Sequence, residues 1–125
     1  MNKIPVILFL LITGLIGCEN NNEYDACIKA DNQELEELAN KIYSELQSQG
    51  YHLTGDVLFT TVEAEYPDGS FTRNGINCMG YIQWKNNEWF VEVTRPYQNW
   101  VVEHELKHAC GIDVDKDEKY YLLLH

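Results

Sequence analysis

The chain has 125 residues, a length that fits one folded domain. Its 20 Asp and Glu outnumber 9 Lys and Arg, which gives a formal net charge of −11 at pH 7. This balance argues against a nucleic acid partner, because binding a phosphate backbone requires clustered Lys and Arg. The acidity instead indicates a well-hydrated surface.

The first 17 residues lack the pattern of a folded domain. Lys3 precedes an apolar run at residues 4–12, which has the length of a signal-peptide core and is too short to span a bilayer. The run leads to Leu15-Ile16-Gly17-Cys18, which resembles the lipobox of bacterial lipoproteins. In that family the signal is removed before the cysteine, and a diacylglycerol is attached to its sulfur. The resemblance implies a signal peptide at 1–17 and a lipid on Cys18.

A lipid on Cys18 would anchor the chain to a membrane of the bacterial cell envelope. The alternative is an ordinary secretory signal followed by an incidental cysteine. The residues after Cys18 are polar and have no apolar periodicity, which is typical of a flexible tether. We expect the tether over residues 18–30 and the folded domain over residues 31–125.

Three cysteines follow Cys18, namely Cys27, Cys78 and Cys110. The cell envelope permits a disulfide, but an odd number leaves at least one thiol without an internal partner. Cys78 with Cys110 and Cys27 with Cys78 are both open as pairs. A free buried cysteine is the alternative for each of them.

Apolar residues recur at helical spacing beyond Asp31. They stand three and four positions apart, with charged residues between them: Leu35, Leu38, Ile42 and Leu46. Such spacing places them on one face of a helix. Asp31 or Asn32 can cap the start of this helix, and Gly50 can end it. The pattern predicts a helix over about residues 33–49.

The middle of the chain has the pattern of strands. Residues 57–62 are rich in branched and aromatic side chains, which favours a strand. Pro67-Asp68-Gly69-Ser70 is a turn signal. Two further extended runs, residues 80–85 and 88–93, are separated by Asn86-Asn87, which predicts a β-hairpin.

A last long helix is expected from about Asn99 to Cys110. Asn99 is a good capping residue, and Gly111 is well placed to stop the helix. Beyond it, residues 112–125 predict an acidic turn and a short strand or helix. The order of the elements predicts an α+β fold with an N-terminal helix, a small three- to four-stranded sheet and a C-terminal helix.

The C-terminal helix carries His104-Glu105-Leu106-Lys107-His108, which has the H-E-x-x-H pattern. Residues four apart lie on the same face of a helix, so His104 and His108 can direct their imidazoles at one ion about 2 Å away. Glu105 reaches the space beside the ion, where its carboxylate can take a proton from water and pass it to a leaving amine. The pattern predicts a zinc site with His104 and His108 as ligands and Glu105 as the general base.

Apolar residues of the same helix are expected to hold it against the core. Those on the face roughly opposite the two histidines are Val102, Leu106, Ala109 and Cys110. With this back packed, the histidines would face a cleft that a substrate can enter. The alternative is a solvated amphipathic helix on which the two histidines and the glutamate are ordinary surface residues.

The run from His104 to Gly111, HELKHACG, resembles the active-site helix of the zincin metallopeptidases. Its His-Ala-x-Gly ending is especially similar to the metzincin branch, and the helix–sheet–helix layout is similar to the N-terminal half of a zincin. The resemblance implies a zinc-dependent peptidase with a peptide or protein substrate. In that family an edge strand binds the substrate backbone by strand addition, and residues 81–93 contain the candidates.

The third metal ligand departs from the pattern of the family. A metzincin places it three residues after the glycine, where this chain has Val114. Asp113 and Asp115 flank that position and are the first candidates, followed by His125 and then Glu118. No methionine follows the motif, so the methionine turn below a metzincin ion is missing.

These departures keep two other functions open. One is a catalytically inactive zincin-like lipoprotein that binds metal and acts as a binding or inhibitor module. The other is an envelope lipoprotein in which the motif is accidental.

Overall fold

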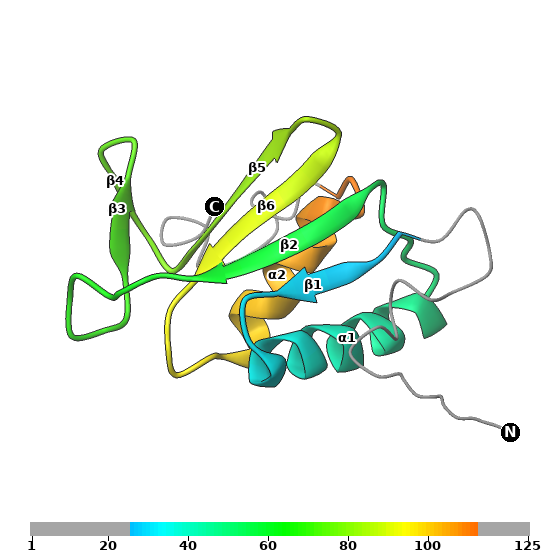
Figure 1. Cartoon of the computed structure of the whole chain (residues 1–125), viewed down its shortest axis with the longest axis horizontal. Coiled ribbons are helices and arrows are strands. Elements are labelled where there is room, and N and C mark those ends of the chain that lie inside the picture. The colour runs from blue at the N-terminus through cyan, green and yellow to red at the C-terminus, as the bar shows by residue number, and fades with distance from the viewer. Residues whose placement is uncertain (1–25, 113–125) are drawn as a thin grey trace, which may run out of the picture.

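The structure, a computed structural model, describes residues 26–112. In chain order its elements are β1 (Ile28–Ala30), α1 (Gln33–Ser48), β2 (Asp56–Thr61), β3 (Phe71–Arg73), β4 (Ile76–Cys78), β5 (Gly80–Lys85), β6 (Glu88–Val93) and α2 (Asn99–Ala109). Both helices pack on one face of a four-stranded sheet, and β3 and β4 form a separate small hairpin (Figure 1). The predicted α+β fold is confirmed.

The main sheet is mixed, with strand order β1-β2-β6-β5. β1, β2 and β6 run parallel, whereas β5 runs antiparallel to β6 and forms an edge. Parallel neighbours need a crossover connection, and α1 supplies it between β1 and β2. The hairpin of β5 and β6 has the predicted bounds, and its two turn residues, Asn86 and Asn87, adopt φ of 56° and 65°. Asparagine tolerates this left-handed conformation better than most residues.

The helices begin close to where the sequence predicts. Asn32 caps α1, because its side-chain oxygen accepts a hydrogen bond from the N–H of Leu35 at 3.0 Å. The N-cap of α2 lies one residue before the predicted position, so the prediction of Asn99 as the cap is wrong. Asn99 is already helical, and Gln98 holds the cap position without a side-chain hydrogen bond to the helix. Gly111 ends α2 as expected: its φ is 85°, and its N–H donates a hydrogen bond to the carbonyl oxygen of His108.

The folded domain begins earlier than predicted. The expected tether runs to residue 30, but Ile28–Ala30 forms β1 and pairs in parallel with β2. The Ile28 side chain is buried at 2 % exposure, so this strand is part of the core. Residues 1–17 and the tether up to residue 25 lie outside the described residues.

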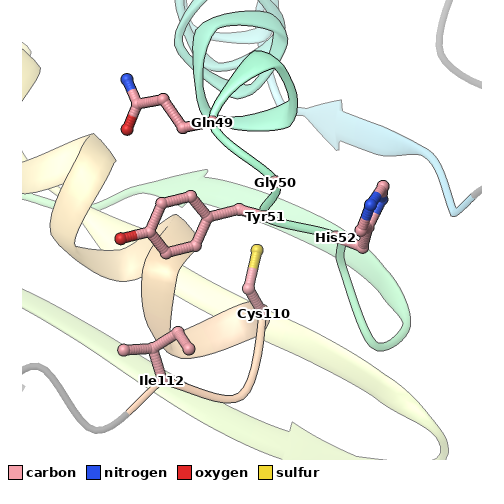
Figure 2. A pocket seen from close by; sticks show the side chains of 6 residues that line it. All are labelled: Gln49, Gly50, Tyr51, His52, Cys110 and Ile112. Carbon is pink, nitrogen blue, oxygen red and sulfur yellow. The ribbon is translucent and has the colours of Figure 1, made fainter.

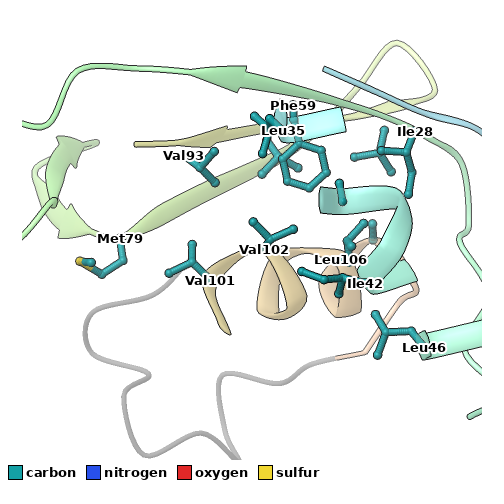
Figure 3. Close-up of a cluster of buried hydrophobic side chains, with 14 residues drawn as sticks. Ile28, Leu35, Ile42, Leu46, Phe59, Met79, Val93, Val101, Val102 and Leu106 are labelled. Atoms are coloured by element: carbon teal, nitrogen blue, oxygen red, sulfur yellow. The ribbon is translucent and has the colours of Figure 1, made fainter. Parts of the chain in front are cut away.

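Apolar side chains from the sheet and from both helices form one core. In Figure 3, Phe59 and Val93 point from the sheet toward the helices. Val57 and Val91 belong to the same core cluster, together with the buried helix residues Leu35, Ala39, Ile42, Leu46, Val101, Val102, Leu106 and Ala109. The positions in the sheet alternate along each strand, as expected for a sheet with one packed face. The core therefore holds α2, the helix that carries the H-E-x-x-H motif, against β5 and β6.

Neither of the two open disulfide pairs forms. Cys78 is a buried free thiol and Cys110 is a half-buried free thiol, so the alternative of a free cysteine applies to both. Cys27 is disulfide-bonded, but to neither of these two. Between residues 26 and 112 no helix is long and apolar enough to cross a membrane.

Candidate functional site

The motif lies in the second half of α2 and is buried more deeply than its sequence predicts. His104 is 1 % exposed and Glu105 is fully buried, while His108 is half-buried. The alternative in which all three are surface residues is therefore wrong. Of the four residues expected at the back of the helix, Val102, Leu106 and Ala109 are buried as predicted, and Cys110 is half-buried.

The two histidine rings lie side by side on the helix. Their centroids are 4.8 Å apart, and their planes meet at 85°. A ring nitrogen binds zinc at about 2 Å, which puts a ring centroid roughly 3 Å from the ion. Two such rings at a tetrahedral angle have centroids about 5 Å apart. The observed spacing of His104 and His108 thus fits two ligands of one ion.

The Glu105 carboxylate lies against the first residue of the edge strand β5. A Cβ atom placed on Gly80 would stand 2.6 Å from Oε2 of Glu105 and 3.2 Å from its Cδ. The side chain therefore fills the space between α2 and the backbone of β5. The nearby thiol of Cys78 has its pKa raised to about 11, mainly by burial and further by the negative charge of Glu105.

The C-terminal end of the motif helix is bound to the loop before β2 through Thr54. The N–H and the hydroxyl of Thr54 both donate to the carbonyl oxygen of Ala109, at 2.9 and 2.8 Å. On the outer face of the helix, Lys107 and Glu103 form an ion pair at 3.2 Å. Lys107 and His108 stand in the last turn, where the helix dipole favours positive charge.

A third ligand is not found among the described residues. Within residues 26–112 no three His, Cys, Asp or Glu side chains are grouped so that they could hold an ion. The predicted candidates all lie outside this part of the chain: Asp113, Asp115, Glu118 and His125. The described residues thus bring together two nitrogen donors and the carboxylate of Glu105.

The edge strand can be assigned more narrowly than from the sequence. Residues 81–93 were predicted to contain it, but β6 lies inside the sheet between β2 and β5. Of the two strands, β5 is the one at an edge of the sheet formed by residues 26–112, and β5 also contacts α2. Sequence reasoning gave no role to Gly80, the first residue of this strand, because its contact with Glu105 joins residues 25 positions apart.

A surface pocket of about 250 Å³ lies near the end of α2 but does not include the motif. It is lined by Gln49, Gly50, Tyr51, His52, Cys110 and Ile112 (Figure 2). Figure 2 shows the Cys110 sulfur pointing toward Tyr51. Burial raises the pKa of this thiol to about 11, so it is protonated and weakly nucleophilic near neutral pH.

Comparisons with protein-family models, with curated proteins and with solved structures found no match to this chain. The functional assignment therefore depends on the residues of the site themselves.

Proposed function

We propose that this chain is a lipid-anchored, zinc-dependent peptidase of the bacterial cell envelope, a small and divergent relative of the zincin metallopeptidases. The observation that carries the proposal is the arrangement on α2. The ring centroids of His104 and His108 are 4.8 Å apart, and the buried carboxylate of Glu105 lies beside the edge strand β5. An ordinary amphipathic helix gives no reason for burying a histidine and a glutamate together.

His104 and His108 would hold the zinc ion from the described part of the chain. Asp113 or Asp115 would supply the third ligand, with His125 and then Glu118 as alternatives; all four lie outside the described residues. Zinc, when bound, acts as a Lewis acid that polarises the oxygen it contacts. Two imidazoles and a carboxylate or a third imidazole form a donor set that suits this ion.

Glu105 would act as the general base and then as the general acid. Its carboxylate accepts a proton from the attacking water and passes that proton to the leaving amine, so that the residue returns to its ionised form after one turnover.

The edge of β5 would bind the substrate. One side of β5 is paired with β6, and its other side pairs with no strand among residues 26–112. An extended peptide can add to such an edge through main-chain hydrogen bonds. This binding mode brings the peptide backbone past Gly80, which is where Glu105 reaches the strand.

The lipobox gives the proposed location. A lipid on Cys18 would hold the domain at a membrane, and residues 18–28 can reach at most about 35 Å when fully extended. The domain would therefore act close to the membrane surface. Cys18 and the signal at residues 1–17 lie outside the described residues.

A second candidate function is a zincin-like lipoprotein that binds metal without catalysis and acts as a binding or inhibitor module. The observation that favours it is the depth of the site, since His104 is 1 % exposed and Glu105 is fully buried. Structural zinc sites are typically closed, whereas catalytic ones keep a position open. In this case zinc would stabilise the domain, and the free edge of β5 would bind a protein partner.

Metal content and cleavage, measured on the same variants, separate these functions. The purified protein should contain about one equivalent of zinc, which His104→Ala and His108→Ala should both lose. His52→Ala is the matched control, because His52 is exposed and is not part of the motif. Glu105→Gln should keep zinc but lose cleavage of a mixed peptide library.

Each outcome of this experiment selects one function. Loss of cleavage in Glu105→Gln with retained zinc supports the peptidase. Bound zinc without any cleavage by the unchanged protein supports the noncatalytic module. A protein that binds no zinc rules out both, and leaves an accidental motif.

A further inference from the structure

Gly80 makes a close contact at the motif. The nearest atoms to a Cβ placed on it are Oε2 of Glu105 at 2.6 Å, Cγ1 of Val101 at 3.0 Å and Cδ of Glu105 at 3.2 Å. Real Cβ atoms essentially never approach another heavy atom as closely as the first of these distances. The Glu105 carboxylate therefore occupies the space that a side chain at position 80 would need.

The carboxylate has little freedom to give way to a larger residue. Glu105 is fully buried, and the neighbouring helix residues Val101 and Leu106 are 4 % and 0 % exposed. A packed interior transmits a change of one methyl group instead of absorbing it. A methyl group on residue 80 would thus move either the carboxylate or the start of β5.

The backbone of Gly80 does not itself require glycine. Its φ lies outside the left-handed region, unlike that of Gly69, Gly75 or Gly111. The residue sits in a strand, paired with Val93 of β6, where an alanine normally stabilises relative to glycine. Any loss caused by alanine at this position must therefore come from the contact with neighbouring side chains.

We infer that Gly80 is a positioning residue: the bare backbone at the start of β5 sets the place of the Glu105 carboxylate beside the histidine pair. This inference rests on the proposed peptidase function. It adds that the edge strand has a second role besides binding substrate, because the same strand fixes the general base. Gly80 touches no reacting atom and acts through Glu105.

The first test compares the kinetics of Gly80→Ala with those of the unchanged full chain. A displacement of the base on the order of 1 Å should lower kcat about 10- to 100-fold. KM should change little, since the main-chain groups of β5 that bind the peptide are kept. Zinc content should also stay at the level of the unchanged protein, because the three atoms nearest to a Cβ at residue 80 belong to Glu105 and Val101 and to neither histidine.

Gly55→Ala is the matched control. A Cβ at Gly55 would stand 2.8 Å from the ring of Trp84, which is as tight a contact but against an exposed side chain that can move. This substitution should leave kcat unchanged. If Gly80→Ala has the kcat of the unchanged protein, or if it lowers kcat only as far as Gly55→Ala does, Gly80 has no positioning role.

The second test measures the contact without using activity. Gly80→Ala should lower the melting temperature, and the same change made in a Glu105→Ala background should not, because the carboxylate that it displaces is gone. The same substitution made in a Val101→Ala background measures how much of the loss comes from the other close contact, that with Val101. If Val101→Ala, and not Glu105→Ala, removes the loss in melting temperature caused by Gly80→Ala, the inference is wrong. It is also wrong if the Gly80→Ala, Glu105→Ala double variant fails to fold.

The two proposals can fail separately. If the unchanged protein cleaves no peptide, the peptidase function is wrong, and a role of Gly80 in catalysis falls with it. If the unchanged protein is active while Gly80→Ala is equally active, only the inference on Gly80 is wrong.

Discussion

The hydroxyl group of Thr54 donates a hydrogen bond to the carbonyl oxygen of Ala109 at 2.8 Å and accepts one from the indole N–H of Trp89 at 2.9 Å. Ala109 is the last residue of α2 and directly follows His108. A single side chain in the loop before β2 therefore connects the end of the motif helix to strand β6.

Thr54→Val removes this hydroxyl while it keeps the shape of the side chain and the backbone bond to Ala109. We expect a loss of about 1–3 kcal/mol in the free energy of unfolding, because a carbonyl and an indole N–H each lose a partner. Urea unfolding measures the change. Thr60→Val is the control, since the Thr60 side chain lies on the face of the sheet away from the helices and should shift the free energy by less than about 0.5 kcal/mol. Equal losses in both variants would show that the hydroxyl of Thr54 does not hold α2.

The third zinc ligand can be found by single substitutions in the C-terminal segment. Asp113→Ala or Asp115→Ala should weaken zinc binding at least about 100-fold, more than the loss of an outer hydrogen bond to a ligand usually does. Competition with a chromophoric chelator measures the affinity. Asp117→Ala is the matched control, because it removes the same charge from the same segment.

His125 and Glu118 are the remaining candidates for the third ligand. If neither aspartate variant weakens zinc binding, His125→Ala is the next to test and Glu118→Ala follows. Retention of full affinity in all four variants would leave zinc with only His104 and His108, and the proposed site would be wrong.

The two free thiols predict a loss of stability in alkali. Burial raises the pKa of Cys78 and of Cys110 to about 11, above the ordinary value of 9.0. Below pH 9 both thiols are protonated in the folded and the unfolded chain, so their contribution is fully present. Between pH 9 and 11 the unfolded chain releases protons that the folded chain keeps, and the free energy of unfolding falls.

Replacement of both thiols by alanine should flatten this part of the pH profile. The double variant is expected to be less stable at about pH 8, because two small cavities form, but to lose less stability between about pH 9 and pH 11. Thermal unfolding at a series of pH values gives both quantities. Parallel profiles for the variant and the unchanged protein would mean that other groups cause the alkaline loss.

Lipid attachment predicts a defined chemical product. The mature chain should begin at Cys18, should carry a diacylglycerol mass on that residue, and should sediment with membranes. Cys18→Ser should abolish both the mass shift and the sedimentation, whereas Cys27→Ser should not. Intact-mass measurement is decisive here, because an attached diacylglycerol adds a defined mass to the mature chain.

Local patterns predicted the regular elements well. The apolar spacing of α1 and the Asn pair between β5 and β6 are signals within one element, and both gave bounds within one residue. β1 was missed because three residues are too few to show alternation, and its pairing with β2 depends on residues 29 positions away. The hairpin of β3 and β4 did have a local signal, since Asn74-Gly75 takes φ of 53° and 76° and Asn-Gly favours such turns.

The motif was only partly readable from the sequence. The four-residue spacing of His104 and His108 predicts that their rings lie together, and their centroids are 4.8 Å apart. The burial of Glu105 follows instead from the approach of β5 to α2, which brings Gly80 against the carboxylate. No pattern within α2 contains that information, because it belongs to the packing of a strand against a helix.

The strand order β1-β2-β6-β5 has a consequence for how the domain would sit at a membrane. The chain enters the sheet through β1 at one edge, and the free strand β5 forms the opposite edge. With strands about 4.8 Å apart, the two edges are separated by about 15 Å. A lipid tether pulling on β1 would leave β5 on the far side of the sheet, so the surface proposed to receive peptides would be turned away from its own anchor.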